Sequence, residues 1–301
     1  MKRVRGRAPR PGALFLPRKP DTNKGDYGRL LILAGSKGMS GAAVLCARAA
    51  LRAGAGLVTV AVPEEIQPVV AVCVPEAMTL ALPHAGGVLA ASAIGKLDKY
   101  LLSEGCDLIL AGPGLGKSPG VDSAVKFLLE LNMPLVLDAD ALNSISRAGG
   151  FPKPRAARII TPHPGEAARL LKTTIAQVQA CRRDSAVSLA RCCGGVAVLK
   201  GHGTLVAGIN GRMHRNESGG PELAKGGSGD VLAGLLSGLW VQRGRQCGFD
   251  ADTAYESAVA AVFTHGLCGE YAAEAFGGKS VIAGDLLSYF PKAFRTAGRE
   301  L

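Results

Sequence analysis

Short apolar runs alternate with helix-length segments along most of the chain. The runs are rich in Val, Ile and Leu without polar interruption, which is typical of strands that are buried on both faces. We predict strands at RLLILAG (29–35), GLVTVAV (56–62), AMTLAL (77–82), DLILAG (107–112), PLVLDA (134–139), ARIITP (157–162), VAVLKG (196–201) and TLVAG (204–208). Between them lie helical segments such as 41–54 and 121–132. This order predicts an α/β fold in a single domain, with a doubly wound, mostly parallel sheet flanked by helices.

The last third of the chain has a different pattern. After residue 208 we predict successive helices at roughly 228–243, 251–272 and 283–297. Such a run of helices indicates a helical layer packed on the sheet. Gly234 and Gly238 recur on one face of the first of these helices and predict close helix packing there.

The loops that follow the predicted strands carry most of the candidate chemistry. In open parallel sheets, ligands bind beyond the carboxyl ends of the strands. The loops in those positions are AGSKGMSGA (34–42), AGPGLGKS (111–118), DADALN (138–143), TPHPGE (161–166) and KGHGT (200–204). We therefore expect one ligand site that is built from several of these loops.

The net charge of +11 is concentrated at the N-terminus. Residues 1–20 carry seven Lys or Arg and no acid, so the remaining residues carry only 11 − 7 = +4. The segment is rich in Pro and Gly, and we interpret residues 1–22 as a basic flexible arm and 23–301 as the folded domain. Most of the excess positive charge lies in this arm, and the arm has almost no aromatic residues. We therefore predict no nucleic-acid partner.

Hydropathy and cysteine usage bear on the compartment. No apolar run reaches the roughly 18 residues that a membrane helix needs, so we predict a soluble protein with no membrane partner. The eight cysteines include no C-x-x-C pair, and most lie in Ala- and Leu-rich stretches. We interpret them as small buried apolar residues in a reducing cytoplasm.

The stretch ELAKGGSGDVLAGLLSG (222–238) is the strongest motif. Gly226, Gly227 and Gly229 let backbone N–H groups turn into one concavity, and a helix that begins near Ser228 adds its positive end. Residues 226–229 are thus a candidate anion hole. The carboxylate of Asp230 would repel an anion, so it is not there to bind phosphate. We interpret Asp230 as a general base that takes a proton from a hydroxyl during phosphoryl transfer.

Three other motifs are less specific. AGPGLGKS nearly spells a nucleotide phosphate loop, but Pro113 removes one of the N–H groups that such a loop needs, so a glycine-lined wall is the better interpretation. In TPHPGE, the two prolines hold His163 in a rigid turn before a helix, and Glu166 falls in the first turn of that helix. Lys200 ends a strand, where its ammonium can meet a phosphate.

Taken in order, these motifs resemble the NAD(P)H-hydrate dehydratase family within the ribokinase-like fold. The resemblance covers about residues 23 to 295. It implies dehydration of the S epimer of hydrated NADH or NADPH, with ADP converted to AMP and phosphate, and a cytoplasmic cofactor-repair role. The resemblance also implies a homotetramer. Many relatives carry an epimerase domain on the N-terminal side, and here we expect the epimerase to be a separate protein that acts as a functional partner.

The same resemblance implies roles for individual residues. The residues implied to contact the hydrated dinucleotide are Ala42, Gly114, His163 and Asp230. Those implied to hold ADP or ATP are Lys200, Gly201, His202, Gly203, Thr204 and Gly229, while Gly226, Gly227, Ser228 and Gly229 stabilise the transferred phosphoryl group. We also expect Mg²⁺ as a cofactor, because the reaction moves a phosphoryl group between anions. Its candidate ligands are Asp138, Asp140 and Glu166.

Two other functions fit parts of the sequence. A vitamin-precursor kinase of the same fold uses the same base and anion hole, so GGSGD alone does not separate it from the dehydratase. The extended set of loops favours the dehydratase, since a dinucleotide needs a longer groove than a small alcohol. A non-catalytic nucleotide sensor would have no use for a general base at Asp230.

Overall fold

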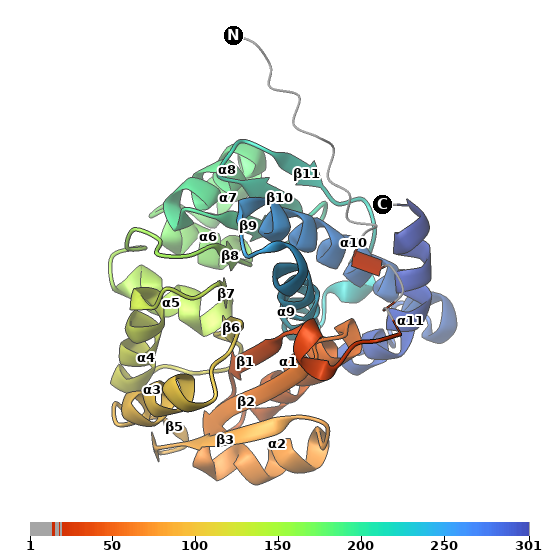
Figure 1. Ribbon diagram of the computed structural model, residues 1–301. Helices are drawn as coiled ribbons and strands as arrows, with labels where there is room; N and C mark the ends of the chain where they lie inside the picture. The colour runs from red at the N-terminus through yellow and green to blue at the C-terminus, as the bar shows by residue number, and fades with distance from the viewer. Residues whose placement is uncertain (1–13, 16–17, 19, 301) are drawn as a thin grey trace.

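The computed structural model describes residues 14–15, 18 and 20–300, and its centre is a nine-stranded sheet (Figure 1). The strand order is β11-β10-β9-β8-β7-β6-β1-β2-β3. All pairings from β9 to β3 are parallel, and β10 and β11 are added antiparallel to β9. The strands are β1 (Arg29–Leu33), β2 (Leu57–Pro63), β3 (Met78–Leu82), β6 (Leu108–Ala111), β7 (Leu135–Leu137), β8 (Arg158–Ile160), β9 (Val196–Leu199), β10 (Leu205–Gly208) and β11 (Met213–Arg215).

All eight predicted strands are present, so the mostly parallel α/β fold is confirmed. Several strands are shorter than their apolar runs, because the last residues of each run already turn toward the loops. The strand β11, which pairs with β10 after residue 208, was not predicted. A small hairpin, β4 (His84–Ala85) and β5 (Val88–Leu89), was also not predicted. These strands lie in segments without a continuous apolar run, whereas β7 and β8, which also have three residues, lie within longer apolar runs.

Helices cover both faces of the sheet, which explains why its strands are continuously apolar. Successive residues of β1 alternate between the two cores: Leu30 and Ile32 lie in one, Leu31 and Leu33 in the other. The first core is covered by α1 (Ser40–Ala53), α2 (Gln67–Cys73), α9 (Ser228–Cys247), α10 (Ala251–Phe276) and α11 (Ala283–Glu300). The second is covered by α3 (Ala93–Ser103), α4 (Pro119–Glu130), α5 (Ala139–Arg147), α6 (Pro164–Leu170), α7 (Ile175–Ala180) and α8 (Arg182–Cys193). Short 3₁₀ turns are η2 (Lys24–Tyr27), η3 (Glu64–Ile66) and η4 (Pro221–Leu223).

The predicted helical layer is therefore present, and its first helix, α9, packs directly on α1 (Figure 1). A Cβ atom at Gly234 would lie 2.3 Å from the carbonyl oxygen of Cys46, and one at Gly238 would lie 2.6 Å from that of Ala50. Both glycines are required by this close approach, as their spacing predicted. The contact sets the position of α9, and with it the position of the GGSGD turn at its N-terminus.

Most of the predicted N-terminal arm lies outside the described residues. In the part that is described, the ring of Phe15 packs on Phe294 with 5.3 Å between centroids. The guanidinium of Arg18 stacks 3.6 Å from the ring centroid of Tyr27. These contacts hold residues 15 and 18 against α11 and the start of the domain.

The cysteine prediction is only partly correct. All eight thiols are free, and Cys46, Cys193 and Cys268 are buried. Three others are exposed: Cys181 between α7 and α8, Cys192 on α8 and Cys247 at the end of α9. No helix in the described part of the chain has the length and apolar character needed to cross a bilayer.

Candidate active site

The five predicted loops lie side by side at one edge of the sheet. They follow β1, β6, β7, β8 and β9, which are consecutive neighbours in the strand order. Because these strands are parallel, their carboxyl ends meet at the same edge. The N-terminus of α9 is brought to this edge by the packing of α9 on α1.

The GGSGD motif forms the turn into α9, which begins at Ser228 as predicted. Gly227 has a φ of 88°, and a Cβ atom there would lie 2.6 Å from Cδ1 of Leu45, so only glycine fits. At Gly226 a Cβ atom would meet nothing within 4 Å, and at Gly229 its nearest neighbour would be Lys200 Nζ at 3.5 Å. Gly227 therefore makes the turn, while the other two glycines leave the backbone open to a ligand.

Asp230 lies in the first turn of α9 and is only partly exposed. Within the described residues no group hydrogen-bonds to its carboxylate. Burial, together with the charge of Asp138 and against the opposing ammonium of Lys200, raises the pKa of Asp230 to about 6. A carboxylate with a raised pKa and free lone pairs can accept a proton at neutral pH.

Lys200 and Asp138 form a buried ion pair with 2.7 Å between Nζ and Oδ1. Burial alone would lower the pKa of Lys200, but the charges of Asp138 and Glu166 outweigh it and leave the pKa raised, so the side chain is cationic. Glu166 is buried too, and this burial raises its pKa to about 7. Lys200 thus places a positive charge next to Gly229, at the mouth of the candidate anion hole.

His163 is the N-cap of α6, which begins at Pro164 as predicted. Its Nδ1 accepts a hydrogen bond from the N–H of Gly165 at 3.0 Å, and Glu166 Oε2 accepts one from the backbone N–H of His163 at 2.8 Å. Nε2 lies 3.3 Å from Glu166 Oε1. Since Nδ1 is an acceptor, Nε2 carries the ring proton, and burial lowers the pKa of His163. About half of the side chain (51%) stays exposed at the loop edge.

Ala42 and Gly114 meet across the loops after β1 and β6. A Cβ atom at Gly114 would lie 2.9 Å from Cβ of Ala42, and Gly114 has a φ of 60°. Both residues are partly exposed. The neighbouring Gly116 donates its N–H to Asp140 Oδ2 at 2.8 Å, which ties this loop to the start of α5.

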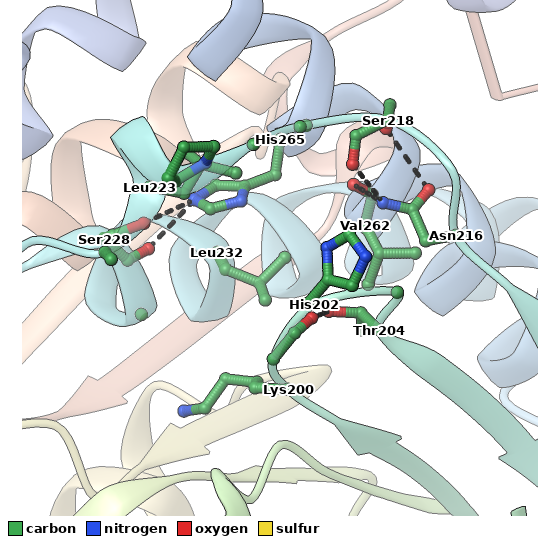
Figure 2. Close-up of a pocket in the computed structure, with 18 of the residues that line it drawn as sticks. Lys200, His202, Thr204, Asn216, Ser218, Leu223, Ser228, Leu232, Val262 and His265 are labelled. Atoms are coloured by element: carbon green, nitrogen blue, oxygen red, sulfur yellow. Dashed lines mark hydrogen bonds between the residues drawn. The ribbon is translucent and has the colours of Figure 1, made fainter. Parts of the chain in front are cut away.

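A cavity of about 650 Å³ opens between the 200–204 loop, the N-terminus of α9 and α10 (Figure 2). This volume is in the range of small-molecule sites. Eight of the residues that line it were singled out from the sequence: His163, Lys200, Gly201, His202, Gly203, Thr204, Ser228 and Gly229. Five of the residues predicted to contact the substrate, the nucleotide or the phosphoryl group do not line this cavity: Ala42, Gly114, Gly226, Gly227 and Asp230. The structure therefore divides the predicted site residues between the cavity and the loops beside it.

Much of the cavity wall was not predicted. It includes Asn216, Ser218, Leu223, Val262 and His265, from the segment after β11 and from α10. Asn216 Nδ2 donates to the carbonyl oxygens of Ser218 and Val262, at 3.0 and 3.2 Å, and so fixes this segment against α10. In the sequence, α10 has the pattern of an ordinary core helix, and no local signal marks the side that faces a cavity.

Comparison with known proteins agrees with this geometry. The sequence profile of the NAD(P)H-hydrate dehydratase family matches residues 30–292. The chain belongs to that family. A bifunctional NAD(P)H-hydrate repair enzyme of Moorella thermoacetica is 40% identical over 290 residues, which are 95% of this chain and 53% of that enzyme. The chain thus spans about half the length of this relative.

Two further members of the NAD(P)H-hydrate dehydratase family match over most of their own length. An ADP-dependent (S)-NAD(P)H-hydrate dehydratase of Neisseria meningitidis is 34% identical over 91% of this chain and 87% of its own. The crystal structure of an ADP/ATP-dependent NAD(P)H-hydrate dehydratase from Bacillus subtilis, co-crystallised with ATP and Mg²⁺, superposes with a TM-score of 0.81. It is 31% identical and covers 95% of this chain and 96% of that chain. This structural similarity confirms the ribokinase-like fold.

The three candidate metal ligands are all engaged with protein partners. Asp138 pairs with Lys200, Asp140 accepts from Gly116 N–H, and Glu166 accepts from His163 N–H. Among the described residues, no group of three or more His, Cys, Asp or Glu side chains is arranged to hold a metal ion.

Proposed function

We propose that this protein removes water from the S epimer of hydrated NADH or NADPH, with conversion of ADP to AMP and phosphate. Family membership supports the reaction, and relatives of comparable length carry this activity in their names. One observation carries the proposal in the structure. The Asp230 carboxylate, with its pKa raised to about 6, stands at a helix N-terminus beside a cationic lysine.

In the first step, Asp230 accepts the proton of the ring hydroxyl of the hydrate. The hydroxyl oxygen attacks the terminal phosphorus of ADP, and the bond from that phosphorus to the bridging oxygen breaks, so AMP leaves with the bond's electron pair. A base whose pKa lies near the working pH is suited to this proton transfer. The absence of a hydrogen bond to the carboxylate from the described residues leaves its lone pairs available for the substrate.

The negative charge on the transferred phosphoryl group is met by backbone amides of residues 226–229. They lie at the N-terminus of α9, a helix of 20 residues whose dipole favours an anion there. The Lys200 ammonium, next to Gly229, adds a full positive charge. Donors that are already in place before the reaction stabilise the transition state without a reorganisation cost.

In the second step, phosphate leaves the substrate carbon. The lone pair on the neighbouring ring nitrogen assists the break of the carbon–oxygen bond, and the adjacent ring carbon then loses a proton to the departing phosphate, which completes the double bond. Phosphate is a better leaving group than hydroxide, which makes this step faster than direct loss of hydroxide. Because ADP is converted to AMP and phosphate overall, the free energy of that conversion drives the loss of water. This step needs no further protein nucleophile.

The two ligands occupy adjoining parts of the site in this proposal. The adenosine nucleotide lies in the 650 Å³ cavity against the 200–204 loop, with its phosphates toward Ser228 and Gly229. The hydrated ring lies at the loop edge beside Ala42 and Gly114 and next to Asp230, with His163, which also lines the cavity, between the two ligands. Mg²⁺ fits this arrangement as an ion held mainly by nucleotide phosphates and water, the usual mode for this metal. We also propose a homotetramer in the cytoplasm, the compartment in which free thiols persist.

A direct assay tests the proposal. The protein is incubated with hydrated NADH, ADP and Mg²⁺, and the absorbance of the reduced nicotinamide is followed. We expect recovery of absorbance, with AMP and phosphate formed in equal amounts. Failure to recover the nicotinamide, together with phosphorylation of a small primary alcohol, would identify the chain as a kinase instead. Replacing ADP with ATP in parallel reactions decides the co-substrate.

A further inference from the structure

His265 is the one buried histidine of the described cavity wall, and the proposed mechanism gives it no role. It lies on α10 and is 7% exposed. Its Nε2 is 3.0 Å from the backbone carbonyl oxygen of Ser228 and 3.2 Å from the hydroxyl oxygen of the same residue. Figure 2 shows the ring facing Ser228 across the start of α9. The contact joins α10 to the first residue of α9, where the candidate anion hole is formed.

The carbonyl contact decides which ring nitrogen holds the proton. A carbonyl oxygen only accepts hydrogen bonds, so at 3.0 Å Nε2 must carry the hydrogen. Burial and the charge of Lys200 together lower the pKa of His265 to about 4, although the hydrogen bond to the Ser228 carbonyl tends to raise it. The ring is therefore neutral at physiological pH, with an Nε2–H donor and a bare Nδ1.

This tautomer also determines the orientation of the Ser228 hydroxyl. Because Nε2–H is a donor, the hydroxyl oxygen at 3.2 Å is an acceptor toward His265. The proton of the hydroxyl must then point elsewhere, and Ser228 lines the cavity in which the nucleotide phosphates are proposed to lie. A hydroxyl oriented in this way can donate to a phosphate oxygen.

The first turn of α9 has few other side-chain attachments. Its N-cap is Gly227, which has no side chain. Ser228 N–H donates to Lys225 O at a long 3.3 Å, and the thiol of Cys46 contacts Asp230 O at 3.2 Å. The bond from His265 is thus the main lateral attachment of Ser228 in the described structure. Loss of it would free the residue that begins the anion hole.

We propose that His265 is a positioning residue for phosphoryl transfer: its Nε2–H donates to Ser228, fixes the first residue of α9 and leaves the Ser228 hydroxyl proton for the terminal phosphate. This inference rests on the proposed function, since it assigns the terminal phosphate of ADP to residues 226–229. The role belongs to His265 acting through Ser228. The ring itself does not transfer a proton in the reaction.

The test compares two amide variants that differ by one methylene. In His265→Gln the side-chain N–H₂ reaches the position of Nε2, whereas in His265→Asn it reaches only the position of Nδ1. Both are polar and neutral, so a difference between them reports reach rather than polarity. We expect His265→Asn to lower kcat by a factor on the order of 10², the effect of misplacing an oxyanion donor. The KM for the hydrate should change by less than about threefold, and His265→Gln should restore kcat to within about fivefold of the parent.

His214→Leu is the matched control. His214 is another histidine whose pKa is lowered by burial, and its Nε2 is buried without a hydrogen-bond partner in the described structure. It lies on β11 and does not line the cavity. We expect parent-like kcat and KM in this variant. A fall in kcat there as large as in His265→Asn would show a general effect of losing a buried histidine and would overturn the proposal.

Binding of ADP and AMP gives a second measurement that does not depend on turnover. By calorimetry, His265→Asn and Ser228→Ala should each weaken ADP binding by about tenfold, the worth of one hydrogen bond to a charged group, and the double variant should lose no more than about tenfold. AMP, which lacks the terminal phosphate, should bind as in the parent to within about twofold. Equal kcat and equal ADP affinity in the Gln and Asn variants, whether both high or both low, would overturn the inference. If the parent itself fails to recover NADH, the proposed function fails, and the ADP-against-AMP comparison still decides the role of His265.

Discussion

The ammonium of Lys200 lies 2.7 Å from Oδ1 of Asp138, although the two residues are 62 positions apart in the sequence. The side chain of Asp138 is 2% exposed and that of Lys200 is 18% exposed. Each charge is therefore compensated mainly by the other. The pair links the carboxyl end of β9 to that of β7 and, through its charges, influences the pKa of Asp230.

Lys200→Met is expected to destabilise the protein by about 3 kcal/mol at neutral pH, because it leaves Asp138 as a buried charge without a partner. The double variant Lys200→Met/Asp138→Asn should recover most of this loss. Denaturant unfolding without ligand measures both. Arg147→Met is the control, since its partner Asp122 is 43% exposed and such a pair contributes less than about 1 kcal/mol. Equal losses for the Lys200 and Arg147 variants would contradict the burial argument.

Asp230→Asn keeps the size and polarity of the side chain and removes the base. Turnover of hydrated NADH should fall by a factor on the order of 10² to 10⁴. ADP affinity should persist or increase, because the phosphates are held by backbone amides and a nearby negative charge is lost. Calorimetry beside the rate measurement separates the two effects. A folded Asp230→Asn protein with near-parent turnover would exclude Asp230 as the base.

The rate should depend on pH through the ionisation of Asp230. Its pKa is raised to about 6, so the carboxylate is the ionised base above that pH and is progressively protonated below it. We expect kcat/KM to fall as pH decreases through about 6, with tenfold loss per pH unit well below that value. Steady-state assays, with circular dichroism at each pH as a check on folding, measure this limb. A rate that stays level through this range would contradict the assignment.

His163→Asn separates the two functions of His163. Asparagine is a good N-cap, so α6 should keep its start and the thermal midpoint should change little. The ring that faces the loop edge is lost, and we expect the KM for the hydrate to rise about tenfold while kcat stays within about threefold. His163→Ala is the comparison, because it also removes the cap and should cost about 1 kcal/mol of stability. A change in kcat alone would contradict a binding role.

Ala139 stands between the two acids of the 138–143 loop with a φ of 47°, a left-handed conformation that is unfavourable for alanine. Ala139→Gly should increase the free energy of unfolding by about 1 kcal/mol through relief of this strain, and should lower turnover because Asp138 and Asp140 are held less firmly. Lys172→Gly is the matched control. Lys172 has a φ of 53° at the end of α6, so its replacement should stabilise the protein with no change in turnover. Thermal unfolding and steady-state rates test both variants.

The hydrophobic pattern alone predicted most of the fold, because a strand that is buried on both faces is a continuous run of apolar residues. The eight predicted strands, the three C-terminal helices and the glycine face of α9 all came from local patterns. Motifs with strict local geometry were equally accessible. The start of α9 at Ser228 and the start of α6 at Pro164 follow from glycine and proline, which restrict or release the backbone at their own positions.

Contacts between distant residues were decided only by the tertiary structure. Neither Lys200 nor Asp138 carries a local sign of its partner, since the pairing depends on strand order. The raised pKa values of Asp230 and Glu166 depend on burial by other elements in the same way. His265 sits in a helix with an ordinary core pattern, and only the packing of α10 on α9 turns its ring toward Ser228. Local sequence determines where the strands and helices form, whereas the fold determines which polar side chains are buried and which side chains meet.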